Sequence, residues 1–141
     1  MKNITSTTEK ETIALGQKLG EACVGGEVFA LEGDLGAGKT CLSKGIALGL
    51  RVGDKVNSPT FNIMKVYKAK KGDIKHFCHI DAYRLDEDTN LENIGIDEYL
   101  YKKDTVCVIE WAERIKKVLS KDVKVIRLEH EEENVRRIVI E

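Results

Sequence analysis

Neither sign of charge is in excess in this sequence. It contains 23 Lys and Arg residues against 24 Asp and Glu residues, which gives a formal net charge of −1. A domain that holds nucleic acid by electrostatic attraction needs a surplus of basic residues on one face. The balance argues against DNA as a partner, and we expect any contact with RNA to be indirect, through a partner protein or a local patch.

Long apolar runs are also lacking. No stretch approaches the roughly 18 apolar residues that a membrane-spanning helix needs, and the first residues, MKNITSTTEKE, hold no apolar segment of a secretory signal. The four cysteines, at positions 23, 41, 78 and 107, have none of the short spacings of a zinc site. Scattered thiols of this kind are typical of a reducing compartment. We therefore expect a cytoplasmic protein with no membrane partner and with thiols that fill the core.

The pattern of apolar residues predicts one α/β domain over residues 1–141. The sequence has no repeat, linker or low-complexity tract, and 42% of it is hydrophobic, which suffices for one core. Residues 28–31 and 106–109 are apolar without alternation, as expected of strands covered on both faces. We expect a mostly parallel central sheet that is flanked by helices and carries an antiparallel hairpin. The other expected strands are 62–68, 74–81, 123–128 and 136–140, and the expected helices are 8–24, 39–50, 97–100 and 111–119.

A P-loop follows the first expected strand. The residues Gly33-Asp34-Leu35-Gly36-Ala37-Gly38-Lys39-Thr40 satisfy the pattern G-x-x-x-x-G-K-[ST]. Glycines let successive backbone N–H groups face one anion, and the helix that begins here directs its positive end at the same anion. Lys39 would reach the β- and γ-phosphates of ATP, and the Thr40 hydroxyl would ligate Mg²⁺.

Two strand ends offer the acidic group that a P-loop needs on the metal side. Glu110 follows the apolar run 106–109, and Asp81 ends the expected strand 74–81. Either carboxylate could hold the metal through its water shell, or orient the water that attacks ATP. His76 and His79 lie near Asp81, but alternation puts only His79 on the face of Asp81, so a metal site other than Mg²⁺ is disfavoured.

The loop Ser58-Pro59-Thr60-Phe61 cannot be helical, because a proline forces the residue before it into an extended conformation. Its hydroxyls and its position after the P-loop are typical of a switch that senses the γ-phosphate. An ordinary loop that caps a helix or strand is the alternative.

Six segments together resemble the TsaE (YjeE) family, the ATPase component of bacterial threonylcarbamoyladenosine (t6A) synthesis on tRNA. They span about residues 9 to 113 in the order and spacing of the family, and only the P-loop is specific by itself. In chain order they are Thr12-x-x-Leu15-Gly16, the P-loop, Ser58-Pro59-Thr60-Phe61, His79-Ile80-Asp81-Ala82-Tyr83-Arg84-Leu85, Gly95-Ile96-Asp97-Glu98-Tyr99 and Ile109-Glu110-Trp111-Ala112-Glu113.

The resemblance implies roles for residues that the pattern alone leaves open. It implies that Thr40 and Glu110 surround Mg²⁺, that Asp81 acts in or near catalysis together with Lys39 and Glu110, and that Trp111 borders the nucleotide. Two further residues, Thr12 and Arg137, would approach the base. The next P-loop position, where the family usually has a second Thr, is Cys41, which we place near the nucleotide but not on the metal.

As function, the resemblance implies a Mg²⁺-dependent ATPase that supports threonylcarbamoylation of adenosine 37 in tRNA with TsaB and TsaD. Its activity would be low alone and stimulated by these partners, and tRNA contact would be indirect. A small-molecule P-loop kinase is the alternative enzyme, although Arg51, Arg84 and Arg114 are isolated and form no arginine-bearing lid. A third hypothesis is a nucleotide sensor without hydrolysis. Turnover of ATP without an acceptor separates the ATPase from the kinase, and zero turnover with partners favours the sensor.

Overall fold

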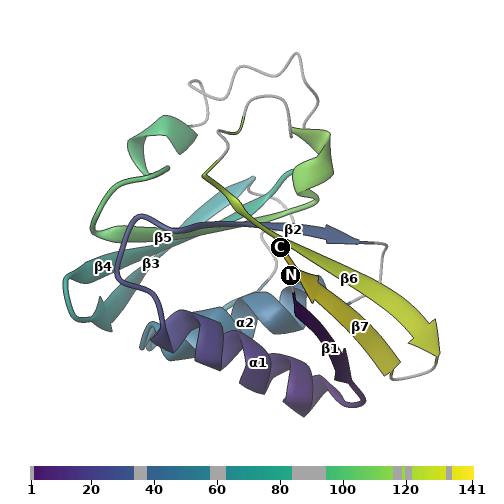
Figure 1. Ribbon diagram of the computed structural model, residues 1–141. Coiled ribbons are helices and arrows are strands. Elements are labelled where there is room, and N and C mark those ends of the chain that lie inside the picture. Colours follow the sequence, from purple (N-terminus) through teal and green to yellow (C-terminus); the bar gives the residue numbers. More distant parts are fainter. Residues whose placement is uncertain are drawn as a thin grey trace.

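A single mixed sheet organises the chain. The computed structural model describes residues 2–33, 38–57, 63–83, 95–115, 119, 122–132 and 135–141. Within these ranges seven strands follow the order β1-β7-β6-β2-β5-β4-β3 across the sheet (Figure 1). The strands are β1 (Lys2–Ser6), β2 (Val28–Gly33), β3 (Met64–Lys71), β4 (Ile74–Asp81), β5 (Thr105–Glu110), β6 (Lys124–Glu132) and β7 (Val135–Ile140).

Parallel pairing occupies the centre of the sheet and antiparallel pairing its two sides. Strands β6, β2, β5 and β4 run parallel to one another. Strand β3 adds to β4 as an antiparallel hairpin, and β7 and β1 add antiparallel beyond β6. The parallel centre and the hairpin confirm the predicted α/β class. Parallel strands matter for function, because their carboxyl ends gather at one edge of the sheet.

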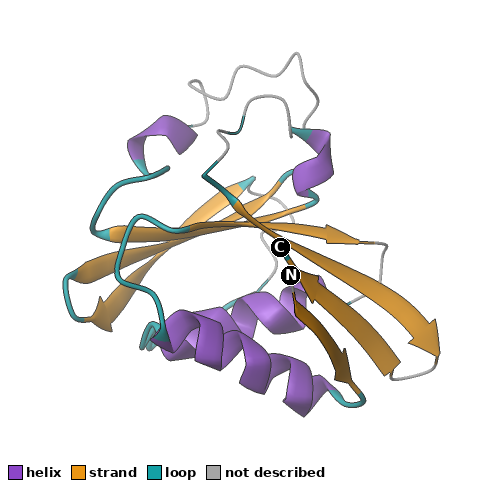
Figure 2. Cartoon of the chain, viewed as in Figure 1, coloured by secondary structure: helices purple, strands orange, loops and turns teal. Residues whose placement is uncertain are grey.

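Two α-helices cover one face of the sheet, and two short 3-10 helices lie over the other (Figure 2). The α-helices are α1 (Glu9–Glu21) and α2 (Lys39–Gly49), and the 3-10 helices are η2 (Ile96–Glu98) and η3 (Ala112–Arg114). Thr8 caps the start of α1, because its hydroxyl accepts a hydrogen bond from the Glu11 N–H at 3.1 Å. Hydrogen bonds from Thr7 lower the pKa of Glu11.

Backbone contact between α1 and α2 needs glycine. A Cβ atom at Gly45 would lie 2.1 Å from the carbonyl oxygen of Ile13, and one at Gly16 would lie 2.4 Å from that of Leu42. Neither carbonyl can turn aside without disturbing its own helix. The glycines therefore let α2, which follows the P-loop, sit directly on α1.

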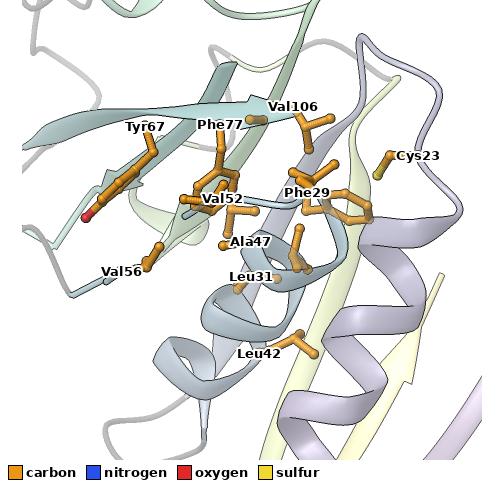
Figure 3. Packing of buried hydrophobic residues seen from close by; sticks show 14 of the residues in the cluster. Cys23, Phe29, Leu31, Leu42, Ala47, Val52, Val56, Tyr67, Phe77 and Val106 are labelled. Atoms are coloured by element: carbon orange, nitrogen blue, oxygen red, sulfur yellow. The ribbon is translucent and has the colours of Figure 1, made fainter. Parts of the chain in front are cut away.

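The core has two layers, one on each face of the sheet. On the face of α1 and α2, sheet side chains such as Phe29, Phe77 and Val106 belong to one cluster with Leu42 and Ala47 of α2 (Figure 3). Burying a large apolar side chain fully contributes about 1.5–3 kcal/mol. On the other face Ile80, Ile109 and Ile115 form a second cluster. With both faces covered, β2 and β5 carry the continuous apolar runs that the sequence showed.

The structure adds β1, a polar segment in which Lys2 lies opposite Ile140 of β7, so that the two ends of the chain lie together (Figure 1). The helix predicted for 111–119 is a 3-10 turn over Ala112–Arg114, with Trp111 before it in a left-handed conformation (φ 59°). Residues 34–37, 58–62, 84–94, 116–118, 120–121 and 133–134 lie outside the described residues, and so do the predicted switch loop and part of the P-loop. No described helix has the length and apolar character needed to cross a membrane.

Candidate nucleotide and metal site

The candidate site lies at the carboxyl edge of the parallel strands. Strand β2 ends at Gly33, β4 at Asp81 and β5 at Glu110. In the register of the sheet, Glu110 lies opposite both Leu31 and Asp81 on its two neighbours. The three strand ends predicted to carry the site therefore lie side by side, with α2 starting beside them. Ligands of open α/β sheets bind at this edge.

The N-terminus of α2 is built to receive an anion. Gly38 precedes the helix in a left-handed conformation (φ 99°), which residues with a side chain rarely adopt. No acidic residue lies in the first turn, and within the described residues no side chain caps it. The first backbone N–H groups of a helix have no partner inside it, and its dipole favours negative charge there. Residues Asp34, Leu35, Gly36 and Ala37 of the motif lie outside the described residues.

Lys39 lies directly over this edge. Only 5% of the residue is exposed, its ammonium donates to the carbonyl oxygen of Gly33, and its Nζ lies 3.7 Å from the centroid of the Trp111 ring. Glu113 approaches from η3. Partial burial raises the pKa of its carboxyl, although a hydrogen bond from the Gly33 N–H and the charge of Lys39 act in the opposite direction. The positive charge is therefore held at the strand edge, where a phosphate would meet it.

The side-chain oxygens of Thr40 and Glu110 lie together at this edge. The Thr40 hydroxyl donates to Oε1 of Glu110 at 3.1 Å, so the start of α2 and the end of β5 are in contact. Hard oxygen donors suit Mg²⁺, which typically takes one or two protein groups, several waters and phosphate oxygens. The described residues hold no group of three or more His, Cys, Asp or Glu side chains that could bind a metal by themselves. This donor set fits Mg²⁺ bound together with a nucleotide.

Glu110 has further partners that the sequence did not reveal. Glu110 is 3% exposed, and its carboxylate contacts the Nε2 atom of His79, a residue that is completely buried. The Ser43 hydroxyl lies 3.4 Å from Oε2 of Glu110 and donates to the Lys39 carbonyl at 2.9 Å. Polar side chains from α2 and β4 thus surround one carboxylate. His76, by contrast, lies edge-on against the Tyr99 ring at 6.1 Å, away from this group.

Asp81 and Trp111 occupy the outer side of the site. The Asp81 carboxylate accepts a hydrogen bond from the Tyr83 N–H at 3.0 Å and is half-buried, so it faces water more than Glu110 does. The rings of Tyr83 and Trp111 meet edge to face at 5.0 Å, and the Arg114 guanidinium lies 5.2 Å from the Tyr83 ring. This row of aromatic and basic side chains leads from Lys39 to the surface.

The two residues predicted to approach the base, Thr12 and Arg137, lie on α1 and β7. A Cβ atom at Gly38 would lie 3.8 Å from Cγ2 of Thr12 and 3.9 Å from Cγ of Arg136. Arg137, the residue that we predicted, pairs with Glu129 at 3.7 Å on the opposite side of the strand. Cys41 is half-buried, and burial raises the pKa of its thiol. The structure therefore brings Thr12 and Arg136 to the P-loop, whereas the predicted role of Arg137 is untested.

A comparison with protein-family models identifies the family of the chain. The model described as "Threonylcarbamoyl adenosine biosynthesis protein TsaE" matches residues 6–139, nearly the whole chain. The chain belongs to the TsaE family. The match confirms the resemblance drawn from the sequence.

Individual TsaE proteins match over most of their length. The chain is 40% identical over 113 residues to "tRNA threonylcarbamoyladenosine biosynthesis protein TsaE" of Bacillus subtilis, covering 80% of this chain and 68% of that protein. It is 35% identical over 135 residues to the protein of the same name from Mycobacterium tuberculosis, and the match covers 89% of this chain and 79% of that protein. The crystal structure of Bacillus subtilis YdiB superposes with a TM-score of 0.80 at 32% identity, covering 99% of this chain and 83% of that one.

Four residues at the candidate site of this TsaE protein were not predicted from the sequence as site residues. Ser43 follows Thr40 by three residues on the same face of a helix, a spacing that could have indicated it. His79 shares its face with Asp81, but its contact with Glu110 depends on the register between β4 and β5. Arg136 reaches the P-loop only through the tertiary fold, and no local signal marks it. Glu113 ends the family segment 109–113, but only the fold brings it to Gly33.

Proposed function

We propose that this protein is a P-loop ATPase that binds Mg²⁺-ATP at the carboxyl edge of β2, β4 and β5 and takes part in t6A formation on tRNA. The observation that carries the proposal is the convergence of Lys39, Thr40 and Glu110 at the start of α2. A lysine, a hydroxyl and a carboxylate in this order are the parts with which P-loop proteins hold phosphates and Mg²⁺. The names of the TsaE relatives support the role in tRNA modification.

The chain itself would supply three actions. The N–H groups at the start of α2 and the Lys39 ammonium bind the phosphates and offset their charge. Thr40 and Glu110 would hold Mg²⁺, and the ion would supply charge neutralisation to the phosphates. Asp81, the more exposed carboxylate, orients the attacking water. For the water to be held, the site must also close, and the predicted switch over residues 58–61 would contribute to that.

The ATPase acts with the TsaB and TsaD proteins in this proposal. A P-loop protein whose site is completed by a partner turns over slowly alone. We expect weak basal phosphate release that rises when purified TsaB and TsaD are added, and contact with tRNA through those partners. The cell compartment in which this occurs is the cytoplasm.

The test measures steady-state phosphate release with Mg²⁺-ATP by this protein alone, with the TsaB–TsaD pair, and with the pair plus tRNA, alongside an assay of t6A. Lys39→Ala is the matched inactive variant. Stimulated turnover and repeated cycles of modification, both lost in Lys39→Ala, support the proposal. Phosphate transfer to a small molecule instead of water favours the kinase. If the pair neither binds the protein nor changes turnover, and t6A forms through many cycles without it, the role in modification is wrong.

A further inference from the structure

A buried histidine contacts the carboxylate at the centre of the candidate metal site. His79 is 0% exposed, and its ring lies 6.0 Å from that of Phe77 at an interplanar angle of 28°. On the neighbouring strand His79 lies opposite Val108, two residues before Glu110. Diagonal neighbours of this kind on one face of a sheet are within reach of a long side chain. The Nε2 atom of His79 meets Oε2 of Glu110 in this way.

The hydrogen-bond pattern sets the tautomer of the ring. An ionised carboxylate only accepts hydrogen bonds, so Nε2 of His79 carries the hydrogen that it donates to Glu110. Among the described residues, Nδ1 of His79 has no hydrogen-bond partner, although it is buried. Burying a polar atom without a partner costs free energy that a hydrophobic ring of the same shape would avoid. A role in filling the core alone therefore does not explain a histidine here.

The donors around Glu110 are divided between its two oxygens. Oε2 meets Nε2 of His79 and lies 3.4 Å from the Ser43 hydroxyl, while Oε1 accepts from Thr40 at 3.1 Å. A planar carboxylate held at Oε2 cannot rotate without losing the bond from His79. Oε1 is thereby kept beside the Thr40 hydroxyl, the other side chain in the proposed site that would hold Mg²⁺. The ring stacking with Phe77 in turn restrains His79.

We propose that His79 is a positioning residue that orients the Glu110 carboxylate for Mg²⁺. The inference rests on the proposed nucleotide and metal site. Partners of this kind, which hold a ligand side chain without touching the metal, typically change metal affinity about 10- to 100-fold when they are removed. Loss of the Nε2 donor should therefore lower the apparent Mg²⁺ affinity of the nucleotide complex by that factor. Nucleotide binding without Mg²⁺ should change little.

The experiment titrates Mg²⁺ against full-length protein with a fluorescent ATP analogue and compares two variants. His79→Phe keeps a ring and removes the donor, whereas His79→Gln keeps an N–H near the position of Nε2. We expect a 10- to 100-fold weaker apparent Mg²⁺ affinity for His79→Phe and substantial recovery for His79→Gln. The matched controls are His76→Phe and His76→Gln on the same strand, since His76 contacts Tyr99 and not Glu110, and they should leave the Mg²⁺ affinity unchanged.

A second readout needs neither metal nor nucleotide. In protein labelled with ¹⁵N-histidine, the Nε2 proton of His79 should give a slowly exchanging, downfield NMR signal that is lost or strongly shifted in Glu110→Ala. The His76 signals should be the same in both proteins. Thermal unfolding without ligand shows whether each variant is folded. If His79→Phe does not fold, His79→Gln and the NMR signal decide the question.

The outcomes separate the inference from the proposed function. Equal Mg²⁺ affinity in folded His79→Phe and wild type, or an Nε2 signal that Glu110→Ala leaves in place, would overturn the positioning role while the site stands. If His79→Phe and His79→Gln lowered the apparent Mg²⁺ affinity equally, the positioning role would also be overturned, because the hydrogen-bond donor would then not matter. If wild-type protein binds nucleotide without any dependence on Mg²⁺, the proposed metal site itself fails.

Discussion

The Nζ atom of Lys39 lies 3.7 Å from the centroid of the Trp111 ring, while the same ammonium donates to the Gly33 carbonyl. A cation over an indole face is attracted by the negative face of the ring. Trp111 directly follows Glu110, so the P-loop lysine touches the segment that carries the proposed metal ligand. Phosphate would offer Lys39 an anionic partner, which makes stronger hydrogen bonds than a neutral carbonyl.

We therefore predict that the fluorescence of Trp111 changes when ADP or ATP binds, because the cation over the ring is drawn toward phosphate. Trp111 is the only tryptophan of the chain, so the signal needs no assignment. Titration with nucleotide should give a saturable change, and Lys39→Ala should show none over the same range. A flat titration under conditions where calorimetry detects binding would contradict the placement of Trp111.

Lys39→Ala should abolish productive ATP binding and leave the protein folded. The ammonium is the cation at the strand edge over which the phosphates would lie, whereas the apolar clusters on either face of the sheet do not include it. Thermal unfolding with Mg²⁺-ATP should show a ligand-induced rise for wild type, as expected for a ligand that binds only the native state. An equal rise in the variant would rule out the P-loop assignment.

The two carboxylates at the strand ends should differ in their effects. Glu110→Ala should weaken the Mg²⁺-dependent part of nucleotide binding and cost about 1–3 kcal/mol of stability, since buried donors lose their acceptor. Asp81→Ala should leave nucleotide affinity closer to wild type and mainly lower turnover. Titrations of a fluorescent nucleotide with and without Mg²⁺, together with urea unfolding, measure both effects. Loss of the metal dependence in Asp81→Ala but not in Glu110→Ala would mean that the roles are reversed.

Gly45→Ala should destabilise the protein through the contact of α1 with α2. The added Cβ would lie 2.1 Å from the carbonyl oxygen of Ile13, so the helices must separate. Overpacking costs about 1–3 kcal/mol or more, and alanine recovers up to about 1 kcal/mol of helix propensity. We expect a net loss of about 1–2 kcal/mol in urea unfolding. The control is Gly53→Ala, where no described atom lies within 4 Å of the added Cβ; equal stability of the two variants would contradict the close packing.

The thiols should differ in reactivity according to burial. Burial raises the pKa of Cys23 to about 12, and a hydrogen bond with Cys78 raises that of Cys107. Because the thiolate is the nucleophile, these residues should resist iodoacetamide at pH 8 until the protein unfolds. The half-buried Cys41, whose pKa is raised by the same cause, should react first and slowly. Mass spectrometry should show that nucleotide protects Cys41, and unchanged labelling at saturating nucleotide would place it outside the site.

The local sequence determined the P-loop, the capped start of α1 and the two apolar strands β2 and β5. Each of these features depends on neighbouring residues: glycines that permit a tight turn, a hydroxyl three residues before an acidic residue, and an apolar run without alternation. It also determined that Glu110 and Asp81 end strands, because each carboxylate follows directly on a run with strand character. The six segments in order were enough to indicate the TsaE family.

Only the tertiary structure decided which of these residues meet. The sequence does not state that β4 and β5 are neighbours in a register that puts His79 diagonal to Glu110, because strand pairing is set by packing across the whole sheet. The polar strand β1 was missed for the same reason, since its place beside β7 comes from the partner strand. Arg136 rather than Arg137 faces Gly38 because alternation along β7 sends adjacent side chains to opposite faces, and the register that selects between them is fixed by long-range contacts.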